Sequence, residues 1–364
     1  MTPHNITIIG AGTMGGGIAI GCLAAGLPTT AIDTTEAALD TLRQRVTAHF
    51  ARQAEKGRIT AAQAEAACAL LRSSTGLDAA SGADLVIEAV FEDLDIKLDL
   101  FRRLAPHLSD GAIVATNTSA LRVTDLAAAI PDPARFLGLH YFSPAEVNPL
   151  VEVVSGPDTT PDTVLAALTF LDTTGKTALP CRDANGFAVN RFFCPYTNEA
   201  ARLLDEGLAS TAQIDAVVRD LCALPLGPFA VMNIIKPRIN LNAIRNLGAL
   251  GPFYAPADSM IATGEAGESW PIDGQPAPLA PDTAALVADR LRAALFLPVL
   301  EALAEGVADP EDFDTGARLA LRFGNPPVAQ MRALGQDRVV ALVTPLCTRY
   351  GAPLPEAGLN RVFE

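Results

Sequence analysis

The sequence is poor in positive charge, in histidine and in cysteine at metal-binding spacings. Its 27 lysines and arginines stand against 41 aspartates and glutamates, which gives a formal net charge of −14. This balance argues against nucleic-acid binding, because that function usually needs a basic surface. The six cysteines form no CxxC or other metal-ligand pattern and are scattered through apolar segments. We therefore expect reduced core cysteines, no metal site and a cytoplasmic location.

Long hydrophobic runs are also missing, so we expect no membrane contact. The apolar stretch from Ile18 to Leu27 is too short and too rich in glycine to span a bilayer. The N-terminus leads into a predicted strand without a charged leader segment. What the chain does have is core material, because 49% of its 364 residues are hydrophobic and 19% are charged. That length suffices for two or three domains.

One of the four histidines, His140, follows the apolar run 136–139, which is typical of a short buried strand. Glu152 lies in a second apolar run, where a carboxylate is costly to bury without a partner. A carboxylate beside an imidazole fixes its tautomer and stabilises its cation, which makes a general base. The competing interpretation is a core histidine satisfied by a backbone carbonyl, with Glu152 on a solvated strand face.

A glycine-rich turn follows the first predicted strand, residues 5–9. Gly10 allows a tight turn, Gly12 lets the backbone approach a pyrophosphate, and Gly15 lets the next helix pack closely on the strand. The helix N-terminus then offers N–H groups and the positive end of its dipole to the phosphates. Because a strand precedes this GxGxxG pattern and an apolar helix follows it, we predict a dinucleotide site that includes Thr13 and Met14.

The second predicted strand, residues 29–33, ends in an acid. Asp33 is placed to accept hydrogen bonds from a ribose diol, and its charge would repel a 2′-phosphate, so the sequence favours NAD over NADP. The competing interpretation is that Asp33 only caps a helix that begins near Thr35.

Strands and helices alternate through the first half of the chain, with two amphipathic helices in 36–72 and further strands near 83–90 and 111–115. This alternation predicts an α/β Rossmann-type domain with a right-handed, mostly parallel sheet. Ligands bind such sheets at the carboxyl ends of the strands. The candidates at or just beyond those ends are Gly12, Asp33, Glu88, Ser119 and His140.

After Asp183 the predicted strands stop and long helices take over. One pattern occurs twice, 99 residues apart, in the pairs Asn190 and Asp289, Glu206 and Glu305, Asp215 and Asp314, and Met232 and Met331. Repetition at one fixed spacing predicts two tandem all-α domains. We expect a Rossmann domain at 1–183, a first helical domain with a linker at 184–281, and a degenerate second helical repeat at 282–364.

The stretch 248–281 is rich in Gly, Pro and Ala and contains the only tryptophan. We interpret it as an irregular linker that packs over the body of the protein. Its aromatic residues Phe253, Tyr254 and Trp270 are more often anchors than ligand stackers in such segments.

With these residues in hand, the chain resembles the L-3-hydroxyacyl-CoA dehydrogenases over essentially its whole length. The motifs that carry the resemblance are Ile-Ile-Gly-Ala-Gly-Thr-Met-Gly at 8–15, Ala-Asp-Leu-Val-Ile-Glu-Ala-Val at 83–90, Thr-Asn-Thr-Ser at 116–119, His-Tyr-Phe-Ser-Pro at 140–144, Pro-Leu-Val-Glu at 149–152 and Gly-Phe-Ala-Val-Asn-Arg at 186–191. The tandem helical domains look most like the dehydrogenase part of multifunctional fatty-acid oxidation proteins.

The resemblance implies NAD-dependent oxidation of a 3-hydroxyacyl-CoA that enters between the first and second domains. His140 would take the hydroxyl proton and Glu152 would hold it, while Ser119 and Asn190 would bind the reacting oxygen or the thioester carbonyl. Other matching positions are Glu88, Lys97, Asn117 and Ser119 near the cofactor. Lys56, together with Ser119, matches positions near CoA. Arg52 and Arg58 are further candidates at the phosphates, and the competing interpretation places both arginines on a solvated face.

Some positions depart from the family pattern and leave the acyl chain length open. They are Asn148 with its charged neighbour Glu146, the segment 232–239, and the linker 248–281. The second repeat has Asp289 in place of Asn190, which implies a structural role. In short family members two chains dimerise through the helical domain, so the second copy would fill that place here. We expect a monomer, or a dimer through another surface, with a hydratase or thiolase as a possible partner.

Two other functions are compatible with the motifs. The chain could be an oxidoreductase of the same superfamily that acts on a hydroxy acid lacking CoA. It could also be a catalytically silent dinucleotide-binding scaffold. The presence of Ser119, His140, Glu152 and Asn190 in register argues against the scaffold.

Overall fold

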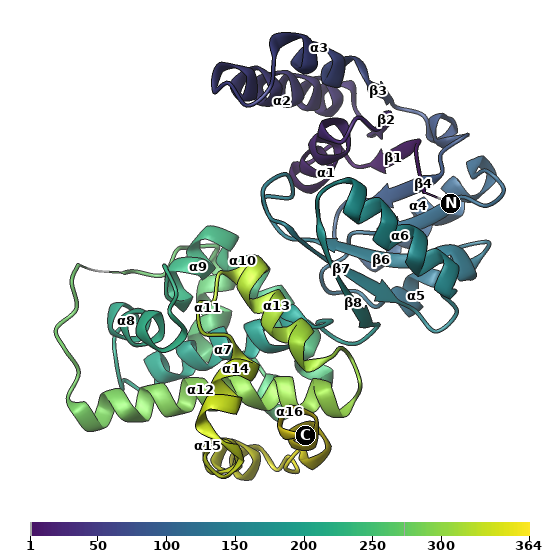
Figure 1. Ribbon diagram of the computed structural model, residues 1–364. Coiled ribbons are helices and arrows are strands. Elements are labelled where there is room, and N and C mark those ends of the chain that lie inside the picture. The colour runs from purple at the N-terminus through teal and green to yellow at the C-terminus, as the bar shows by residue number, and fades with distance from the viewer. Residues whose placement is uncertain (1, 273) are drawn as a thin grey trace. The chain divides into compact units, whose positions relative to one another are not determined.

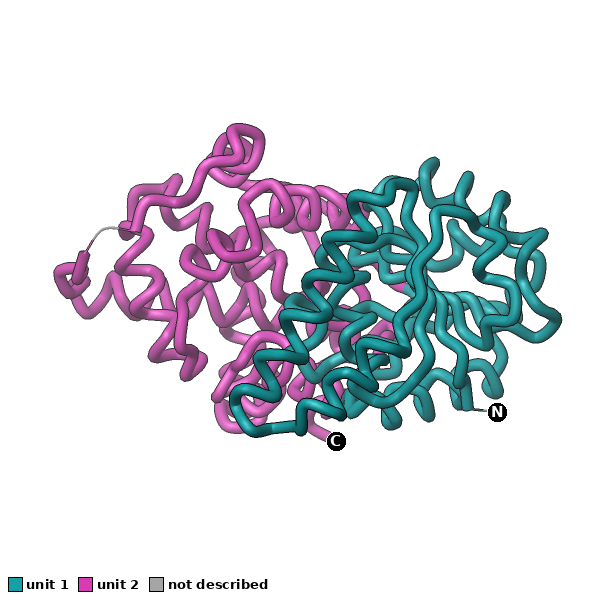
Figure 2. The backbone as a smooth tube through the Cα atoms, turned by 90° about the horizontal axis from the view of Figure 1, so that it is seen from above, with its two compact units in different colours: residues 1–183 teal, residues 184–364 magenta. Residues whose placement is uncertain are grey.

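The structure is a computed structural model that describes residues 2–272 and 274–364 (Figure 1). The chain divides into two compact units, residues 1–183 and 184–364, which are coloured separately in Figure 2. The division falls where the sequence predicts the end of the Rossmann domain.

An eight-stranded sheet forms the centre of the first unit, in the order β3-β2-β1-β4-β5-β6-β7-β8. All neighbouring strands are parallel except β6 and β7, which confirms the mostly parallel sheet. The strands are β1 (Ile6–Ile9), β2 (Thr29–Ile32), β3 (Leu71–Ser74), β4 (Leu85–Glu88), β5 (Ile113–Thr116), β6 (Phe136–Tyr141), β7 (Leu150–Ser155) and β8 (Thr177–Arg182). Strands β1, β4 and β5 are buried on both faces, as parallel strands between helices must be.

Helices connect these strands. They are α1 (Thr13–Ala24), α2 (Glu36–Glu55), α3 (Ala61–Ala69), α4 (Leu94–Leu104), α5 (Val123–Ala127) and α6 (Pro161–Thr173), with short 3₁₀ turns η1 (Leu77–Ala80), η2 (Ala105–His107) and η3 (Pro133–Arg135). Apolar residues of α1, α2 and α6 form one continuous core with the strands. The hairpin of α2 and α3 confirms the two helices predicted between 36 and 72 (Figure 1).

Side-chain caps explain where several of these helices begin. The hydroxyl of Thr35 accepts the N–H of Ala38 at the start of α2. A capping box of Thr60 and Gln63 starts α3, and Asp93 caps α4. These residues satisfy backbone N–H groups that a helix leaves unpaired in its first turn.

The described part of the second unit is helical. Its helices are α7 (Val189–Asp205), α8 (Thr211–Cys222), α9 (Pro228–Ile235), α10 (Pro237–Leu247), α11 (Asp258–Ala266), α12 (Pro281–Ala304), α13 (Pro310–Leu321), α14 (Pro327–Leu334), α15 (Gln336–Tyr350) and α16 (Glu356–Phe363), with 3₁₀ turns η4 (Gly248–Leu250) and η5 (Pro252–Tyr254). Helices α8 and α9 reappear as α13 and α14 with both ends shifted by 99 residues (310 − 211 and 327 − 228). The repetition found in the sequence is therefore present in the secondary structure.

Two buried carboxylates show that the repeat extends to hydrogen bonds. Asp215 accepts the N–H groups of Phe229 and Ala230 at 2.8 and 3.1 Å, at the start of α9. Asp314, 99 residues later, does the same for the first N–H groups of α14 at 2.8 and 3.0 Å. Each repeat thus uses one aspartate to cap the helix that follows.

Helices α7 and α12 contact each other through ion pairs that are reciprocal. Arg191 of α7 pairs with Glu305 at the end of α12, and Arg290 of α12 pairs with Glu206 at the end of α7. Both partners in the first pair are shifted by 99 residues in the second. The arginine of each copy thus meets the glutamate of the other copy. Such reciprocal contacts are typical of two copies related by a two-fold axis.

Both repeats therefore lie in one compact unit, residues 184–364. The division into two helical domains at 281/282 stays a prediction. The linker prediction was partly wrong, because 248–281 contains the regular helix α11. Phe253, Tyr254 and Trp270 are buried, which confirms their role as anchors. None of the six cysteines forms a disulfide in the described residues, and five of them are buried. In the described residues, no helix is both long and apolar enough to cross a bilayer.

Candidate functional site

The turn between β1 and α1 has the geometry that the glycine pattern predicts. Gly10 has φ +104°, and an added Cβ there would lie 2.5 Å from the carbonyl oxygen of Ala89. A Cβ on Gly15 would lie 1.8 Å from the carbonyl oxygen of Gly10. Nothing lies within 4 Å of the Cβ position of Gly12, and no side chain caps α1. The backbone is therefore closed on the protein side of the turn and open on the side from which a phosphate would approach.

Asp33, directly after β2, is bonded to this turn. Its Oδ2 accepts the N–H of Ala11 at 2.8 Å, between Gly10 and Gly12. Helix α2 is capped by Thr35, so the interpretation of Asp33 as a helix cap is wrong. A half-buried acid at the end of β2 and an uncapped helix N-terminus after β1 fit the ribose and the pyrophosphate of a dinucleotide.

His140 and Glu152 face each other in the middle of the one antiparallel pair of the sheet. They are register partners on β6 and β7, and His140 Nδ1 lies 2.6 Å from Glu152 Oε2. Both side chains are buried. The sequence places His140 just after its strand, whereas β6 extends through Tyr141. The pairing itself is confirmed, and the solvated-face interpretation of Glu152 is wrong.

Comparison with known proteins agrees with this geometry. Residues 5–184 match the family model "3-hydroxyacyl-CoA dehydrogenase, NAD binding domain", and residues 186–269 match the C-terminal domain of the same family. The chain is 34% identical over 270 residues to the mitochondrial hydroxyacyl-coenzyme A dehydrogenase of Sus scrofa, which covers 70% of this chain and 84% of that one. The chain belongs to the 3-hydroxyacyl-CoA dehydrogenase family.

Two further relatives extend the likeness over the second repeat. The alpha subunit of the fatty acid oxidation complex of Shewanella amazonensis is 31% identical, with 98% of this chain and 54% of that one covered. A crystal structure of 3-hydroxybutyryl-CoA dehydrogenase from Escherichia coli K12 has a TM-score of 0.87 at 26% identity and covers 98% of this chain and 96% of that one. As a member of this family the chain is an NAD-dependent oxidoreductase, and NAD is its cofactor.

In this dehydrogenase a buried ion pair lies under the ends of β4 and β5. Lys97 Nζ donates to Glu88 Oε1 at 2.6 Å, and Thr116 Oγ1 donates to Glu88 Oε2 at 2.6 Å. All three side chains are fully buried. The resemblance places Glu88 and Lys97 near the cofactor, and that position stays a prediction. Because neither side chain has exposed surface, we infer that they support the residues around them.

Glu92, in the loop between β4 and α4, is the site residue that sequence reasoning missed. Its Oε1 accepts the N–H groups of Ser119 and Ala120 at 2.7 and 3.0 Å and the hydroxyl of Thr118 at 2.7 Å. Its Oε2 lies 3.3 Å from Lys97 Nζ. Burial alone would raise the pKa of Glu92, but the Lys97 charge and these hydrogen bonds hold the pKa below the ordinary Glu value.

Asn117 and Ser119 follow directly after β5. The hydroxyl of Ser119 is 3.2 Å from Glu92 Oε1, so Glu92 binds both the backbone and the side chain of this serine. Asn117 Oδ1 accepts the N–H of Tyr141 at 2.8 Å and joins the end of β5 to the end of β6. Asn117 thus has a structural bond of its own next to His140.

Four further predicted residues belong to other helices. Thr13 and Met14 form the first turn of α1, with Thr13 exposed. Lys56 is exposed at the far end of α2, about 30 Å from the start of that helix at 1.5 Å per residue. Asn190 lies on α7 in the second unit. Its meeting with Ser119 and His140 stays a prediction.

Proposed function

We propose that the chain catalyses the reversible NAD-dependent oxidation of an L-3-hydroxyacyl-CoA to the 3-ketoacyl-CoA, with His140 as the general base. The observation that carries this proposal is the buried 2.6 Å bond between His140 Nδ1 and Glu152. That bond directs the ring, so Nε2 is the nitrogen that exchanges a proton with substrate. A buried carboxylate also stabilises the imidazolium that forms.

The remaining roles follow from this assignment. NAD, when bound, supplies the hydride acceptor. His140 takes the proton of the 3-hydroxyl group as the C3 hydride leaves, so the alcohol loses one hydride and one proton. Ser119 and Asn190 hydrogen-bond the reacting oxygen or the thioester carbonyl. The bonds of Glu92 to the backbone and hydroxyl of Ser119 fix that serine before substrate arrives, which lowers the ordering cost on binding.

The acyl carrier would be held by the α2–α3 hairpin. Lys56 is exposed at the end of α2, and the exposed Arg52 and Arg58 lie close to it in sequence. In a chain of net charge −14, this small basic group is suited to the CoA phosphates. Ser119 would contact the thioester end of the same molecule.

The test follows NADH absorbance with acetoacetyl-CoA and with a longer 3-ketoacyl-CoA, for the wild type and His140→Ala. We expect the mutant rate to fall about 10²–10⁴-fold, the usual contribution of a general base. NADH binding, followed by fluorescence, should be retained. Full activity in His140→Ala would contradict the assignment, and turnover of a free hydroxy acid without turnover of the thioesters would select the non-CoA alternative.

Partners, assembly and location are further proposals. Because one relative is the alpha subunit of a fatty acid oxidation complex, we propose a hydratase or a thiolase as a docking partner. We also propose a monomer, or a dimer through a surface other than the first helical repeat, in the cytoplasm. Pull-down with each candidate enzyme and cell fractionation would test the partner and the location.

A further inference from the structure

Two glycines, Gly16 and Gly17, follow the GxGxxG pattern, and each lies against a charged side chain from another segment. Gly16 and Gly17 are buried in the first turns of α1. A Cβ on Gly16 would lie 2.7 Å from Arg45 Nη1, and a Cβ on Gly17 would lie 2.5 Å from Glu146 Oε2. Any larger residue at either position would displace one of these two groups.

Arg45 and Glu146 meet across the first turn of α1. Arg45 Nη2 donates to Glu146 Oε1 at 2.8 Å, and Arg45 Nη1 donates to the carbonyl oxygen of Thr13 at 2.9 Å. The side chains are only 31% and 15% exposed, so the pair is screened less than a surface ion pair. Arg45 comes from α2 and Glu146 from the loop 142–149 between β6 and β7. The pair therefore joins three segments of the first unit.

Glu146 depends on this partner. Its Oε2 is buried and has no hydrogen-bond partner in the residues that the structure describes. Burial raises the pKa of Glu146, but the hydrogen bond and charge of Arg45, together with a backbone hydrogen bond and the nearby His49, bring the pKa below its ordinary value. His49 and Lys176 also interact electrostatically with Glu146. Arg45 supplies the ion pair, so loss of Arg45 would leave a half-buried carboxylate without its hydrogen-bonded partner.

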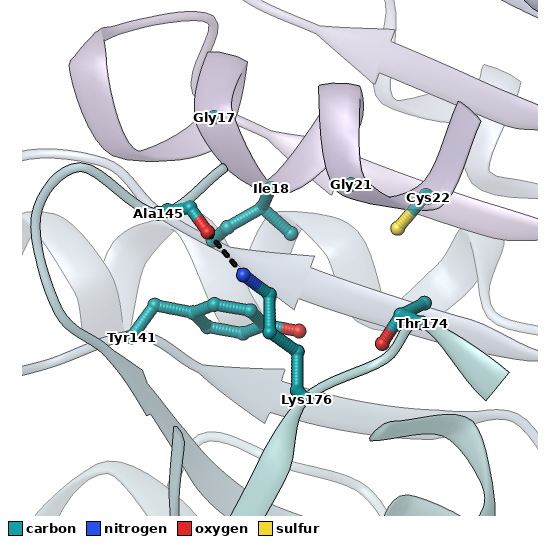
Figure 3. A pocket seen from close by; sticks show the side chains of 8 residues that line it. All are labelled: Gly17, Ile18, Gly21, Cys22, Tyr141, Ala145, Thr174 and Lys176. Carbon is teal, nitrogen blue, oxygen red and sulfur yellow. Dashed lines mark hydrogen bonds between the residues drawn. The ribbon is translucent and has the colours of Figure 1, made fainter. Parts of the chain in front are cut away.

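The loop 142–149 is held from its other side by Lys176. Lys176 Nζ donates to the carbonyl oxygens of Ala145 and Asn148 at 2.6 and 2.7 Å. Figure 3 shows this side chain reaching from the start of β8 past Tyr141 to Ala145, beneath Gly17 and Gly21 of α1. The same loop connects His140 on β6 to Glu152 on β7. Its position therefore bears on both catalytic side chains.

We propose that Arg45 and Glu146 are cofactor-positioning residues, which hold the first turn of α1 against the loop 142–149. The N–H groups of that turn receive the pyrophosphate, so the pair fixes their direction before NAD binds. The proposal rests on NAD as the cofactor and does not depend on the substrate or on His140 as the base. It can therefore fail or stand independently of the proposed reaction.

Electrostatics alone predicts a different result for Glu146. A carboxylate beside the N-terminus of α1 repels a pyrophosphate, so removal of its charge would tighten NADH binding. A positioning role predicts the reverse, because loss of the pair frees the turn and the loop. Removal of Arg45 weakens NADH binding both through lost charge and through lost positioning. Only the Glu146 variants therefore distinguish the two explanations.

The experiment measures NADH dissociation constants by fluorescence, without acyl substrate, for Glu146→Met, Glu146→Gln, Arg45→Met and the double variant Arg45→Met/Glu146→Met. We expect Glu146→Met and Arg45→Met to bind NADH about tenfold more weakly, a coupling typical of a half-buried pair. Glu146→Gln keeps a hydrogen-bond acceptor for Arg45 and should restore most of the affinity. The double variant should be no weaker than Arg45→Met, because it removes the unpaired carboxylate too.

Arg103→Met is the matched control, since Arg103 forms an exposed pair with Asp99 on α4. It should bind NADH as the wild type does. Tighter binding by Glu146→Met, or unchanged NADH affinity together with a lower melting temperature, would overturn the proposal. Additive effects in the double variant would also overturn it. Should Arg45→Met fail to fold, the near-isosteric pair Glu146→Met and Glu146→Gln decides by itself.

Discussion

Individual carboxylates hold the polar side chains of the candidate site. Glu152 binds His140, Glu88 binds Lys97, and Glu92 binds Ser119. A carboxylate accepts several hydrogen bonds at once and needs a charge or an N–H donor when buried. Glu152 and Glu92 therefore each fix a neighbour that the proposed reaction requires, whereas Glu88 holds the fully buried Lys97.

Glu152→Gln tests whether the charge of the acid matters beyond its shape. Gln can still bond His140 Nδ1, but it cannot offset a positive imidazolium, and its amide can bind the wrong tautomer. We expect kcat with acetoacetyl-CoA to fall about 10²-fold or more. NADH affinity should stay within about twofold, because Glu152 is fully buried and contacts His140 rather than the glycine turn. Equal losses in NADH affinity and in kcat would point to a misfolded sheet instead.

Glu92→Gln tests the lowered pKa of Glu92 through stability. A carboxyl group whose pKa is lower in the folded state stabilises the protein above its unfolded pKa, and this contribution is lost as the pH falls through the folded pKa. The variant should melt below the wild type at pH 7. The difference should shrink as the pH falls below about 4, where unfolded Glu becomes protonated. Glu65→Gln, at an exposed position, is the control and should show no such pH dependence.

The sequence predicts these residues unevenly, for a physical reason. Glu152 lies on a predicted strand and His140 directly after one, and the glycine turn and Asp33 are set by local backbone geometry. Glu92 stands in a loop and meets Ser119 across 27 residues, and Arg45 meets Glu146 across 101. Periodicity says nothing about such long-range pairs, which depend on how helices and loops pack over the sheet.

At the scale of secondary-structure elements, the backbone conformation at the junctions between helices is the hardest feature to predict from the sequence. Lys236 separates α9 from α10 with φ 92° and ψ 125°. Its counterpart 99 residues later is Gly335, with φ 80° and ψ 156° at the junction of α14 and α15. The repeat explains this lysine: it keeps a backbone shape that suits glycine. The sequence shows only that 232–239 departs from the family pattern.

Lys236→Gly should therefore stabilise the protein. A non-glycine residue with positive φ costs on the order of 1–3 kcal/mol, and glycine relieves this strain. The greater freedom of glycine in the unfolded state offsets about 1 kcal/mol of that gain. We expect a net gain of about 1 kcal/mol, seen as a melting temperature raised by a few degrees. Gly335→Lys is the reciprocal control and should lower the melting temperature. A destabilised Lys236→Gly would mean that the lysine side chain, which is exposed, makes a contact of greater value than the strain.

At the scale of the whole molecule, the second unit is built like a pair of subunits within one chain. The ion pairs Arg191–Glu305 and Arg290–Glu206 relate α7 and α12 as two-fold partners. The 99-residue spacing predicts this duplication from the sequence. The contact between the copies could not be read from it, because identical spacing does not say which faces meet.

Sedimentation equilibrium over a range of concentrations tests the consequence for assembly. Since α12 already covers α7, the face that would join two chains is buried inside one, and we expect a monomer of 38.0 kDa. A dimer whose interface maps elsewhere by cross-linking agrees with the same argument. Dimerisation through residues 190–232 would contradict it.

The residues that the structure describes contain one Rossmann-type sheet for two helical repeats, and the second repeat has diverged from the first. Where the first copy has Asn190, Phe193 and Ile239, the second has Asp289, Arg292 and Arg338, which form a small ion-pair cluster. In such a monomer, one chain holds one cofactor, with no neighbouring centre whose occupancy could alter its affinity. Saturation by either substrate should then follow a simple hyperbola, with a Hill coefficient of about one.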